Sequence, residues 1–138
     1  MKKFDVELFN ENDLKARKAA ARYWRTLGRV TRHNPDKYGA DLIIDKEFYC
    51  EVEVKKIWKE EFKYDTVQVP YRKLKFTKLE KPCEFMILNS DLTKAFLFDS
   101  FLLATSPVVE VPNKYIDKGE KFFQVPVKCA TLVEIPNE

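Results

Sequence analysis

The sequence predicts an α/β protein in which a mixed β-sheet carries helices packed on it. Near the N-terminus apolar residues recur at helical spacing, and later in the chain short apolar runs alternate with turn residues. A second helical pattern separates two groups of these runs, which places strands before and after a helix. The length of 138 residues fits a single domain over residues 1–138, and the 45% hydrophobic composition can fill its core.

The first helix is expected to begin after Asn10–Asp13, whose side chains offer a cap and first-turn acids. Gly28 is expected to end this helix. Its apolar positions are Ala16, Ala20, Tyr23 and Leu27, and a neighbouring basic stripe consists of Lys15, Lys18, Arg22, Arg25 and Arg29. One face of the helix should therefore pack on the sheet, while the adjacent face is cationic.

Short runs rich in β-branched and aromatic residues predict the strands. The first four are expected at Arg29–His33, Asp41–Ile44, Phe48–Lys55 and Thr66–Pro70, the second and third forming a tight hairpin. A second helix is predicted over Tyr71–Leu79, beginning beside Pro70. Later strands are predicted at Phe85–Leu88, Ala95–Phe98, Phe122–Pro126 and Thr131–Ile135, with a hairpin turn over residues 113–120.

Basic residues are concentrated in the first helix and just beyond it. The net charge is only +3, but residues 14–35 contain seven basic residues and no acid. A local positive field of this kind attracts phosphate, so the region predicts contact with nucleic acid. Within the stretch there are no acids to form the usual i,i+4 pairs, which is unfavourable unless an anion binds.

Other features exclude several classes of protein. Cys50, Cys83 and Cys129 are odd in number and lack a C-x-x-C pair, so reduced thiols are expected rather than a disulfide framework or a zinc knuckle. The first residues carry charges where a secretory peptide needs an apolar run, and no segment is long and apolar enough to span a membrane. We expect a soluble, intracellular, cytoplasmic protein with no membrane partner. His33 has no Ser or Cys beside it, so a nucleophilic triad is not indicated.

Acids and a lysine share one face of the strand predicted over Phe48–Lys55. Because side chains alternate along a strand, Glu51, Glu53 and Lys55 emerge on the same face. Asp41 opens the neighbouring strand of the hairpin. Aligned carboxylates repel one another unless a cation lies between them, so this arrangement predicts a divalent-metal site with a lysine beside it.

This order of elements, with an acid opening the second strand and Glu-x-Lys on the third, resembles the PD-(D/E)xK nuclease superfamily. That superfamily includes Holliday-junction resolvases, many restriction enzymes and some phage exonucleases. The resemblance covers residues 11–90, and the segment Lys-Tyr-Gly39-Ala-Asp41-Leu is similar to the Gly-x-Asp segment of several branches. It implies a restriction-endonuclease-like core of helix, three strands, helix and strand, flanked by helices and extended by C-terminal strands. It is also compatible with a phage or mobile-element gene.

The chemistry of the motif follows from its residue types. Mg²⁺ or Mn²⁺ held by Asp41, Glu53 and the carbonyl of Val54, with Glu51 within reach, would polarise a phosphoryl oxygen and lower the pKa of a bound water. Lys55 could orient that water or stabilise the developing negative charge. These residues, Asp41, Glu51, Glu53 and Lys55, are therefore the predicted catalytic group.

Two registers compete for the central acid. A three-residue turn over residues 45–47 would put Asp41 opposite Glu51, which gives an acid-x-acid motif with Lys55 one step further out. The alternative centres on Glu53-Val-Lys55, the more usual lysine-bearing form. We favour Glu53 with Lys55.

Several other polar residues have a structural and a functional interpretation. Asp36, next to Pro35, is expected to be a turn residue, and Glu11 and Asp13 are expected to cap the helix, although related nucleases can carry a metal-facing acid there. A polar and basic group follows the third strand. Its members either contact phosphates or are ordinary solvated side chains: Gln68, Arg72, Lys73, Lys75 and Lys78. Trp24 and Trp58 are expected in the core.

The sequence therefore predicts a metal-dependent DNA endonuclease acting on duplex or branched DNA, with a homodimer as one way to cut two strands. The alternative from another class is a non-catalytic nucleic-acid-binding module on the same fold. A structural or assembly protein is a third possibility, which would have no affinity for polyanions. The sequence leaves open the choice of DNA or RNA, the mode of cutting and the role of the C-terminal third.

Overall fold

The computed structural model describes residues 6–113 and 116–137. The first part of the chain forms α1 (Val6–Thr26), β1 (Thr31–His33), β2 (Leu42–Ile44), β3 (Phe48–Val54), β4 (Thr66–Pro70) and the 3₁₀ helix η1 (Tyr71–Lys78). The rest forms β5 (Cys83–Leu88), β6 (Lys94–Asp99), α2 (Ser100–Thr105), β7 (Val108–Asn113), β8 (Ile116–Pro126), the 3₁₀ turn η2 (Val127–Cys129) and β9 (Thr131–Glu134).

The strands form two sheets. The larger is six-stranded with the order β1-β2-β3-β5-β6-β9, and the smaller is three-stranded with the order β4-β8-β7. In the larger sheet β3 runs parallel to β5, whereas its other neighbouring pairs are antiparallel. The protein is thus α/β with a mixed sheet, as expected from the sequence.

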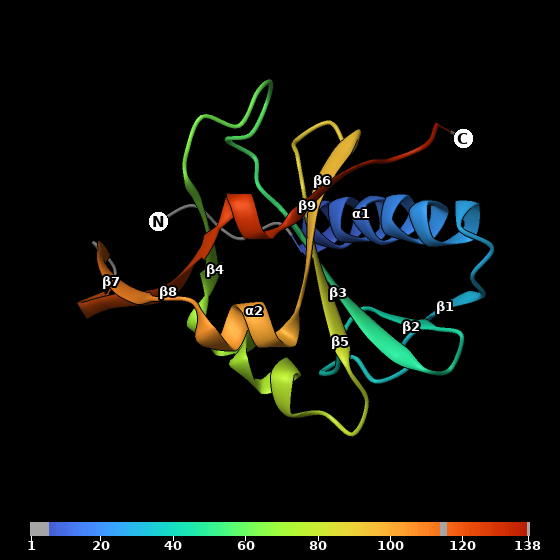
Figure 1. Ribbon diagram of the computed structural model, residues 1–138, viewed down its shortest axis with the longest axis horizontal. Coiled ribbons are helices and arrows are strands. Elements are labelled where there is room, and N and C mark those ends of the chain that lie inside the picture. The colour runs from blue at the N-terminus through green and yellow to red at the C-terminus, as the bar shows by residue number, and fades with distance from the viewer. Residues whose placement is uncertain (1–5, 114–115, 138) are drawn as a thin grey trace.

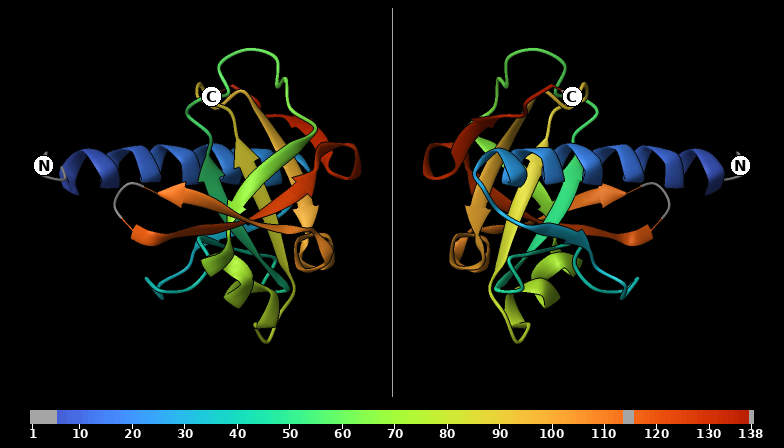
Figure 2. Two further views of the ribbon diagram at one scale, coloured as in Figure 1. Left: turned by 90° about the vertical axis from the view of Figure 1, so that its left-hand side faces the viewer. Right: turned by 90° about the vertical axis from the view of Figure 1, so that its right-hand side faces the viewer.

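Three layers result from this arrangement (Figures 1 and 2). Helix α1 crosses one face of the large sheet, where Ala16, Ala20 and Trp24 pack with Leu42 and Met86.

The opposite face is covered by the small sheet, η1 and α2, and its core contains Phe85, Ile87, Val67, Phe123 and Leu103. Because both faces of β3 and β5 are covered, the middle of β3 and most of β5 are buried, and a charged side chain there must find a partner inside the protein.

Helix α1 begins at Val6, well before the position expected from the sequence. Asp13 therefore lies inside the helix and does not cap it. Gly28 ends the helix as expected, with a positive φ of 78° that glycine adopts without strain. Leu27 was expected on the packed face but is 56% exposed, because the helix ends at Thr26.

Other differences from the sequence prediction lie in the second half. The helix expected over Tyr71–Leu79 is a 3₁₀ helix, and Thr66–Pro70 pairs with β8 in the small sheet instead of joining the large one. The predicted hairpin near residues 113–120 is present, but Asn113 already pairs with Ile116, so the turn is shorter. Its tip, residues 114–115, lies outside the described residues. The sequence reasoning did not predict α2 or β7.

The remaining expectations concern cysteines, tryptophans and membranes. Cys50 and Cys83 are buried and unpaired, and Cys129 is exposed and unpaired. Trp24 and Trp58 belong to the core, as predicted. Among the described residues, no helix has the length and apolar character to cross a membrane.

Candidate functional site

The site is built around Asp41, which a tightly bonded loop presents at the start of β2. The backbone N–H of Asn34 donates to the carbonyl of Asp41 at 3.0 Å, and the Asn34 amide donates to Ala40 at 2.9 Å. Asp36 accepts from Tyr38 N–H within this loop, consistent with its expected role as a turn residue. A Cβ at Gly39 would lie 2.7 Å from the Asn34 amide nitrogen, so a larger residue there would displace this amide from its bond to Ala40.

The observed register sets Asp41 against Glu51. Ile44 pairs with Phe48 and Leu42 with Cys50, so Asp45–Glu47 form the three-residue turn. Val52 N–H then donates to the Asp41 carboxylate at 2.8 Å. This is the register that we weighed but did not favour. The φ values of Asp45 and Lys46, 53° and 61°, show why the turn is specific, since two successive residues adopt the left-handed region.

Glu51 forms a buried ion pair with Lys73 of η1. Its carboxylate lies 3.0 Å from the Lys73 ammonium, and both side chains are at most 10% exposed. Lys73 and Phe76 are the buried residues of η1 because residues three apart line up in a 3₁₀ helix. In an α-helix these two side chains would not lie directly in line. The 3₁₀ geometry therefore places Lys73 on the side of η1 that packs on the sheet.

The charges of this cluster perturb one another strongly. Burial raises the pKa of Glu51, the charge of Lys73 opposes this rise, and Asp41 adds to it through its charge and a hydrogen bond. Burial lowers the pKa of Lys73. The nearby carboxylates of Glu51, Glu53 and Asp41 together outweigh this effect, so the pKa of Lys73 is raised. Lys73 therefore stays protonated among several acids that compete for it.

Glu53 and Lys55 continue the same face of β3 and its extension. The Lys55 ammonium lies 3.9 Å from the Glu53 carboxylate, and these side chains are 20% and 18% exposed. The oxygen of this pair, Glu53 Oε2, is buried, and within the described part of the chain it has no hydrogen-bond partner. A buried carboxylate oxygen without a donor carries a desolvation cost that a cation would offset.

Asp13 approaches this cluster from α1. The pKa of Asp13 is raised overall. Burial and the charge of Asp41 raise it more than the charges of Arg17, Lys73 and His33 lower it. Its carboxylate pairs with Arg17 at 3.0 Å. Sequence reasoning assigned Asp13 to capping because it placed the helix start too late. The helix interior position instead brings the Asp13 carboxyl within range of the charge of Asp41, at the start of β2.

The donor chemistry suits a hard divalent cation, although the cluster is not arranged as a complete coordination shell. Between residues 6 and 137, leaving out 114 and 115, no group of three or more His, Cys, Asp or Glu side chains is placed to hold a metal ion. The Lys73 ammonium binds the Glu51 oxygen that a metal would otherwise contact. Asp41 and the unbonded Oε2 of Glu53 remain as carboxylate ligands of the type that Mg²⁺ uses.

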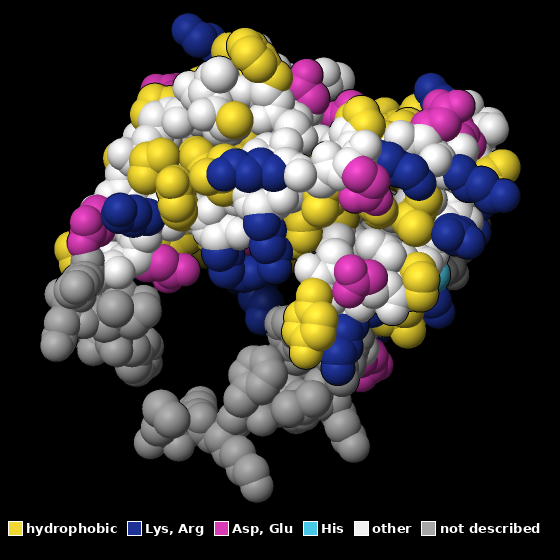
Figure 3. All heavy atoms as spheres, turned by 90° about the horizontal axis from the view of Figure 1, so that it is seen from below, with side chains coloured by type: hydrophobic (Ala, Val, Ile, Leu, Met, Phe, Trp, Pro, Cys, Tyr) yellow, Lys and Arg dark blue, Asp and Glu magenta, His cyan; other side chains and the backbone are white. Residues whose placement is uncertain are grey.

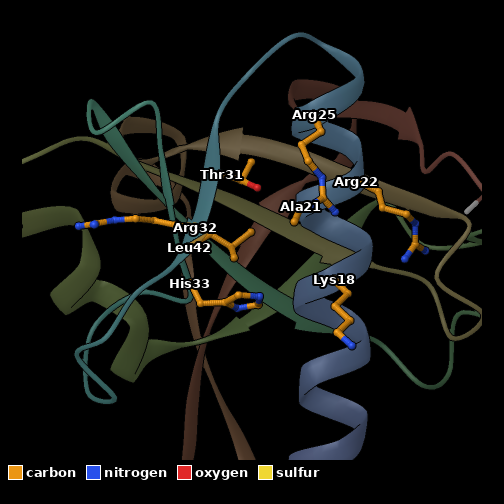
Figure 4. Close-up of a pocket in the computed structure, with 8 residues that line it drawn as sticks. All are labelled: Lys18, Ala21, Arg22, Arg25, Thr31, Arg32, His33 and Leu42. Atoms are coloured by element: carbon orange, nitrogen blue, oxygen red, sulfur yellow. The ribbon is translucent and has the colours of Figure 1, made fainter.

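A basic groove lies between α1 and β1 (Figure 4). Its volume is about 390 Å³, and its lining includes Lys18, Arg22, Arg25, Arg32 and His33. Lys18 and His33 face one another across it, whereas the Arg32 guanidinium points away from α1 and Arg22 donates to the carbonyl of Pro136 at 3.2 Å. None of the lining residues is an acid.

Other members of the predicted basic stripe have partners. Lys15 lies 3.8 Å from Glu11, and Arg29 lies 2.8 Å from Asp45. The expectation that the stripe lacks acidic partners is thus wrong for these two residues, because acids from outside residues 14–35 reach them. Lys18 and Arg25 are exposed and line the groove.

The residues predicted after β3 divide between interior and surface. Lys73 is buried in the acid cluster and does not lie on a solvated face, whereas Arg72 is exposed. Gln68 is exposed on β4 and pairs with Gln124 of β8. Seen from below, Lys and Arg side chains gather beside a recess near the middle of the molecule (Figure 3).

Comparison with protein-family models, with curated proteins and with solved structures gives no match for this chain. The functional assignment therefore rests on the site itself.

Proposed function

We propose that this protein is a metal-dependent endonuclease that hydrolyses DNA phosphodiester bonds, built on a restriction-endonuclease-like core. The observation that carries the proposal is that Asp41 lies opposite Glu51, which Lys73 holds, while Glu53 and Lys55 follow on the same face of β3 with Glu53 Oε2 buried and lacking a hydrogen-bond donor. The chain order is α1-β1-β2-β3-β4-η1-β5, and since β4 joins the small sheet, the large sheet keeps the order helix, three strands, helix and strand, with β3 parallel to β5, which supports the choice of core.

Asp41 and Glu53 would hold Mg²⁺ or Mn²⁺, together with the carbonyl of Val54, while Glu51, which lies opposite Asp41, is held by Lys73 within reach of the ion. When bound, the ion would neutralise charge on the phosphate and lower the pKa of a coordinated water. Mg²⁺ retains several of its own waters, so a small number of protein carboxylates suffices.

The two lysines have different roles in this proposal. Lys55, next to Glu53, can orient the attacking water or stabilise negative charge that develops on the phosphate. Lys73 holds Glu51 in place and keeps part of the negative charge of the cluster neutralised. It is therefore a positioning residue, since its ammonium contacts the carboxylate and not a substrate.

The groove between α1 and β1 would bind the DNA backbone. Lys18 and Arg25 line a hollow without acids, and His33 of this hollow is close enough to Asp13 to affect its pKa. Since His33 pairs with Leu42, the residue after Asp41, backbone phosphates held in the groove would lie near Asp41. Cutting both strands of a duplex with one centre per chain would require a second copy, so a homodimer belongs to the proposal.

The decisive experiment is incubation of supercoiled plasmid, forked DNA and four-way-junction DNA with Mg²⁺ or Mn²⁺, comparing wild type with Asp41→Asn and Lys55→Ala. We expect cleavage by wild type and a loss of about 10²- to 10³-fold in each variant. Salt-sensitive DNA retention without cleavage would instead identify a non-catalytic binding module. Cleavage at the wild-type rate by both variants would refute the assigned centre.

A further inference from the structure

A second hollow opens beside Lys55, on the side of the segment that follows β3. Its volume is about 330 Å³, near the lower end of the range of about 300–1,000 Å³ typical of small-molecule sites. Its lining includes Lys55, Phe62, Tyr64, Thr66, Gln68 and Gln124. Lys55 thus pairs with Glu53 and also lines this hollow.

One wall of the hollow is aromatic and held in place from behind. Phe62 packs edge-to-face on Trp58 at 5.3 Å and on Phe96 at 5.2 Å, both in the core. Tyr64 packs edge-to-face on Phe62, with ring centroids 5.6 Å apart, and yet remains 64% exposed. An exposed aromatic ring supported by a rigid core offers a stacking surface at little entropic cost.

The other wall carries amide side chains. Gln68 of β4 lies directly opposite Gln124 of β8, so the two side chains emerge on the same face of the small sheet. Thr66 is on this outer face too, since the alternate residues Val67 and Val69 are buried. Each amide offers two N–H donors and a carbonyl acceptor, which is the mixed pattern that the edge of a nucleobase presents.

We propose that this hollow binds one nucleobase of the substrate strand, unstacked from its neighbours, next to the phosphate that is cleaved. The position beside Lys55 rests on the proposed endonuclease function, whereas the base-binding property rests on the hollow itself. The combination of an exposed aromatic ring, amides and no lining acid suits a base that stacks and forms hydrogen bonds. A phosphate alone could accept hydrogen bonds from Lys55 and the amides, but it would leave the aromatic ring and the amide carbonyls unused.

The test is an NMR titration of ¹⁵N-labelled protein in EDTA, where no metal-dependent cleavage occurs. The probes are deoxynucleoside 5′-monophosphates and, as the baseless counterpart, 2-deoxyribose 5-phosphate. We expect the nucleotides to shift the side-chain amide signals of Gln68 and Gln124, while the sugar phosphate leaves them in place. Tyr64→Leu should weaken nucleotide binding by about tenfold or more, because stacking on the ring is lost.

The matched control is Tyr38→Leu, which removes a tyrosine that is 75% exposed and does not line the hollow. This variant should bind nucleotides like wild type. Equal shifts from the sugar phosphate, or nucleotide shifts confined to the groove between α1 and β1, would overturn the base-binding proposal. Base binding without plasmid cleavage would refute only the endonuclease, and cleavage without amide shifts would refute only the base site.

Discussion

The ammonium of Lys73 lies 3.0 Å from the carboxylate of Glu51, and this pair joins η1 to the centre of β3 inside the protein. The two residues are 22 positions apart in the chain, and only the 3₁₀ geometry of η1 brings the lysine to the sheet. Because β3 is covered on both faces, Glu51 depends on this lysine to balance its charge.

Replacing Lys73 should therefore destabilise the protein strongly. In Lys73→Met a buried carboxylate loses its cation, and we expect the free energy of unfolding to fall by about 3–5 kcal/mol in urea denaturation. Lys78→Met, on a lysine of η1 outside the buried pair, is the matched control and should change stability by less than about 0.5 kcal/mol. The double variant Lys73→Met/Glu51→Leu should recover most of the loss, since no uncompensated charge remains. A single variant as stable as wild type would contradict this interpretation of the pair.

Divalent cations should stabilise the folded protein through Glu53. At a Mn²⁺ concentration about 100 times the dissociation constant, binding should add about 2.7 kcal/mol to the free energy of unfolding and raise the melting temperature. Glu53→Gln should abolish this rise because a carboxylate ligand is lost. Glu60→Gln, which changes an exposed acid, should retain it. An equal rise in both variants, or no heat in a calorimetric titration of wild type with Mn²⁺, would exclude the proposed ligand.

Asp13 and Glu11 form a matched pair of acids on α1. Each pairs with a basic residue four positions later, and the charges of Asp41 and Lys73 act on the pKa of Asp13. We expect Asp13→Asn to reduce cleavage by roughly 10-fold or more, as is typical of residues that tune a metal site from outside its ligands. Glu11→Gln should cleave like wild type. If the two variants lose the same activity, Asp13 acts through helix stability alone.

The groove between α1 and β1 should govern the salt dependence of DNA binding. In EDTA, Lys18→Ala or Arg25→Ala should each reduce the slope of log K against log salt by about 1, because one phosphate contact is lost. Lys128→Ala changes an exposed lysine that does not line the groove and should leave the slope unchanged. Fluorescence anisotropy at several salt concentrations measures these slopes, and unchanged slopes in both groove variants would place the DNA elsewhere.

Asp45 should make stability depend on pH in the acid range. Hydrogen bonds from Arg29 and from the backbone of Val30 lower the pKa of Asp45 in the folded protein below its ordinary value of 3.8. Its contribution is therefore fully present above the unfolded pKa and disappears as the pH falls through the folded pKa. Asp45→Asn retains a residue that tolerates the observed φ of 53°. The difference in melting temperature between wild type and variant should be constant above about pH 5 and vanish in strong acid. A difference that persists there would mean that the carboxylate charge is not its source.

Local patterns in the sequence were sufficient for much of the architecture. The alternation of Glu51, Glu53 and Lys55 fixed a shared face, and the apolar spacing of Ala16 and Ala20 fixed the packed side of α1, because both periods are set by backbone geometry. Asp41, at the start of β2, was identified in the same way. The start of α1 was misplaced because helix ends depend on capping and packing as much as on residue type.

Three relationships at the site could not be derived from the sequence. The register that sets Asp41 against Glu51 depends on the left-handed conformations of Asp45 and Lys46, and the entry of Lys73 depends on the 3₁₀ period of η1. The joining of β4 to β8 depends on residues more than 50 positions apart. Each is decided by which long-range contacts bury the most apolar surface while satisfying the charges inside, a competition that no local pattern records. The sequence by itself determined which acids and lysines this protein can use, and the tertiary structure decided which of them meet.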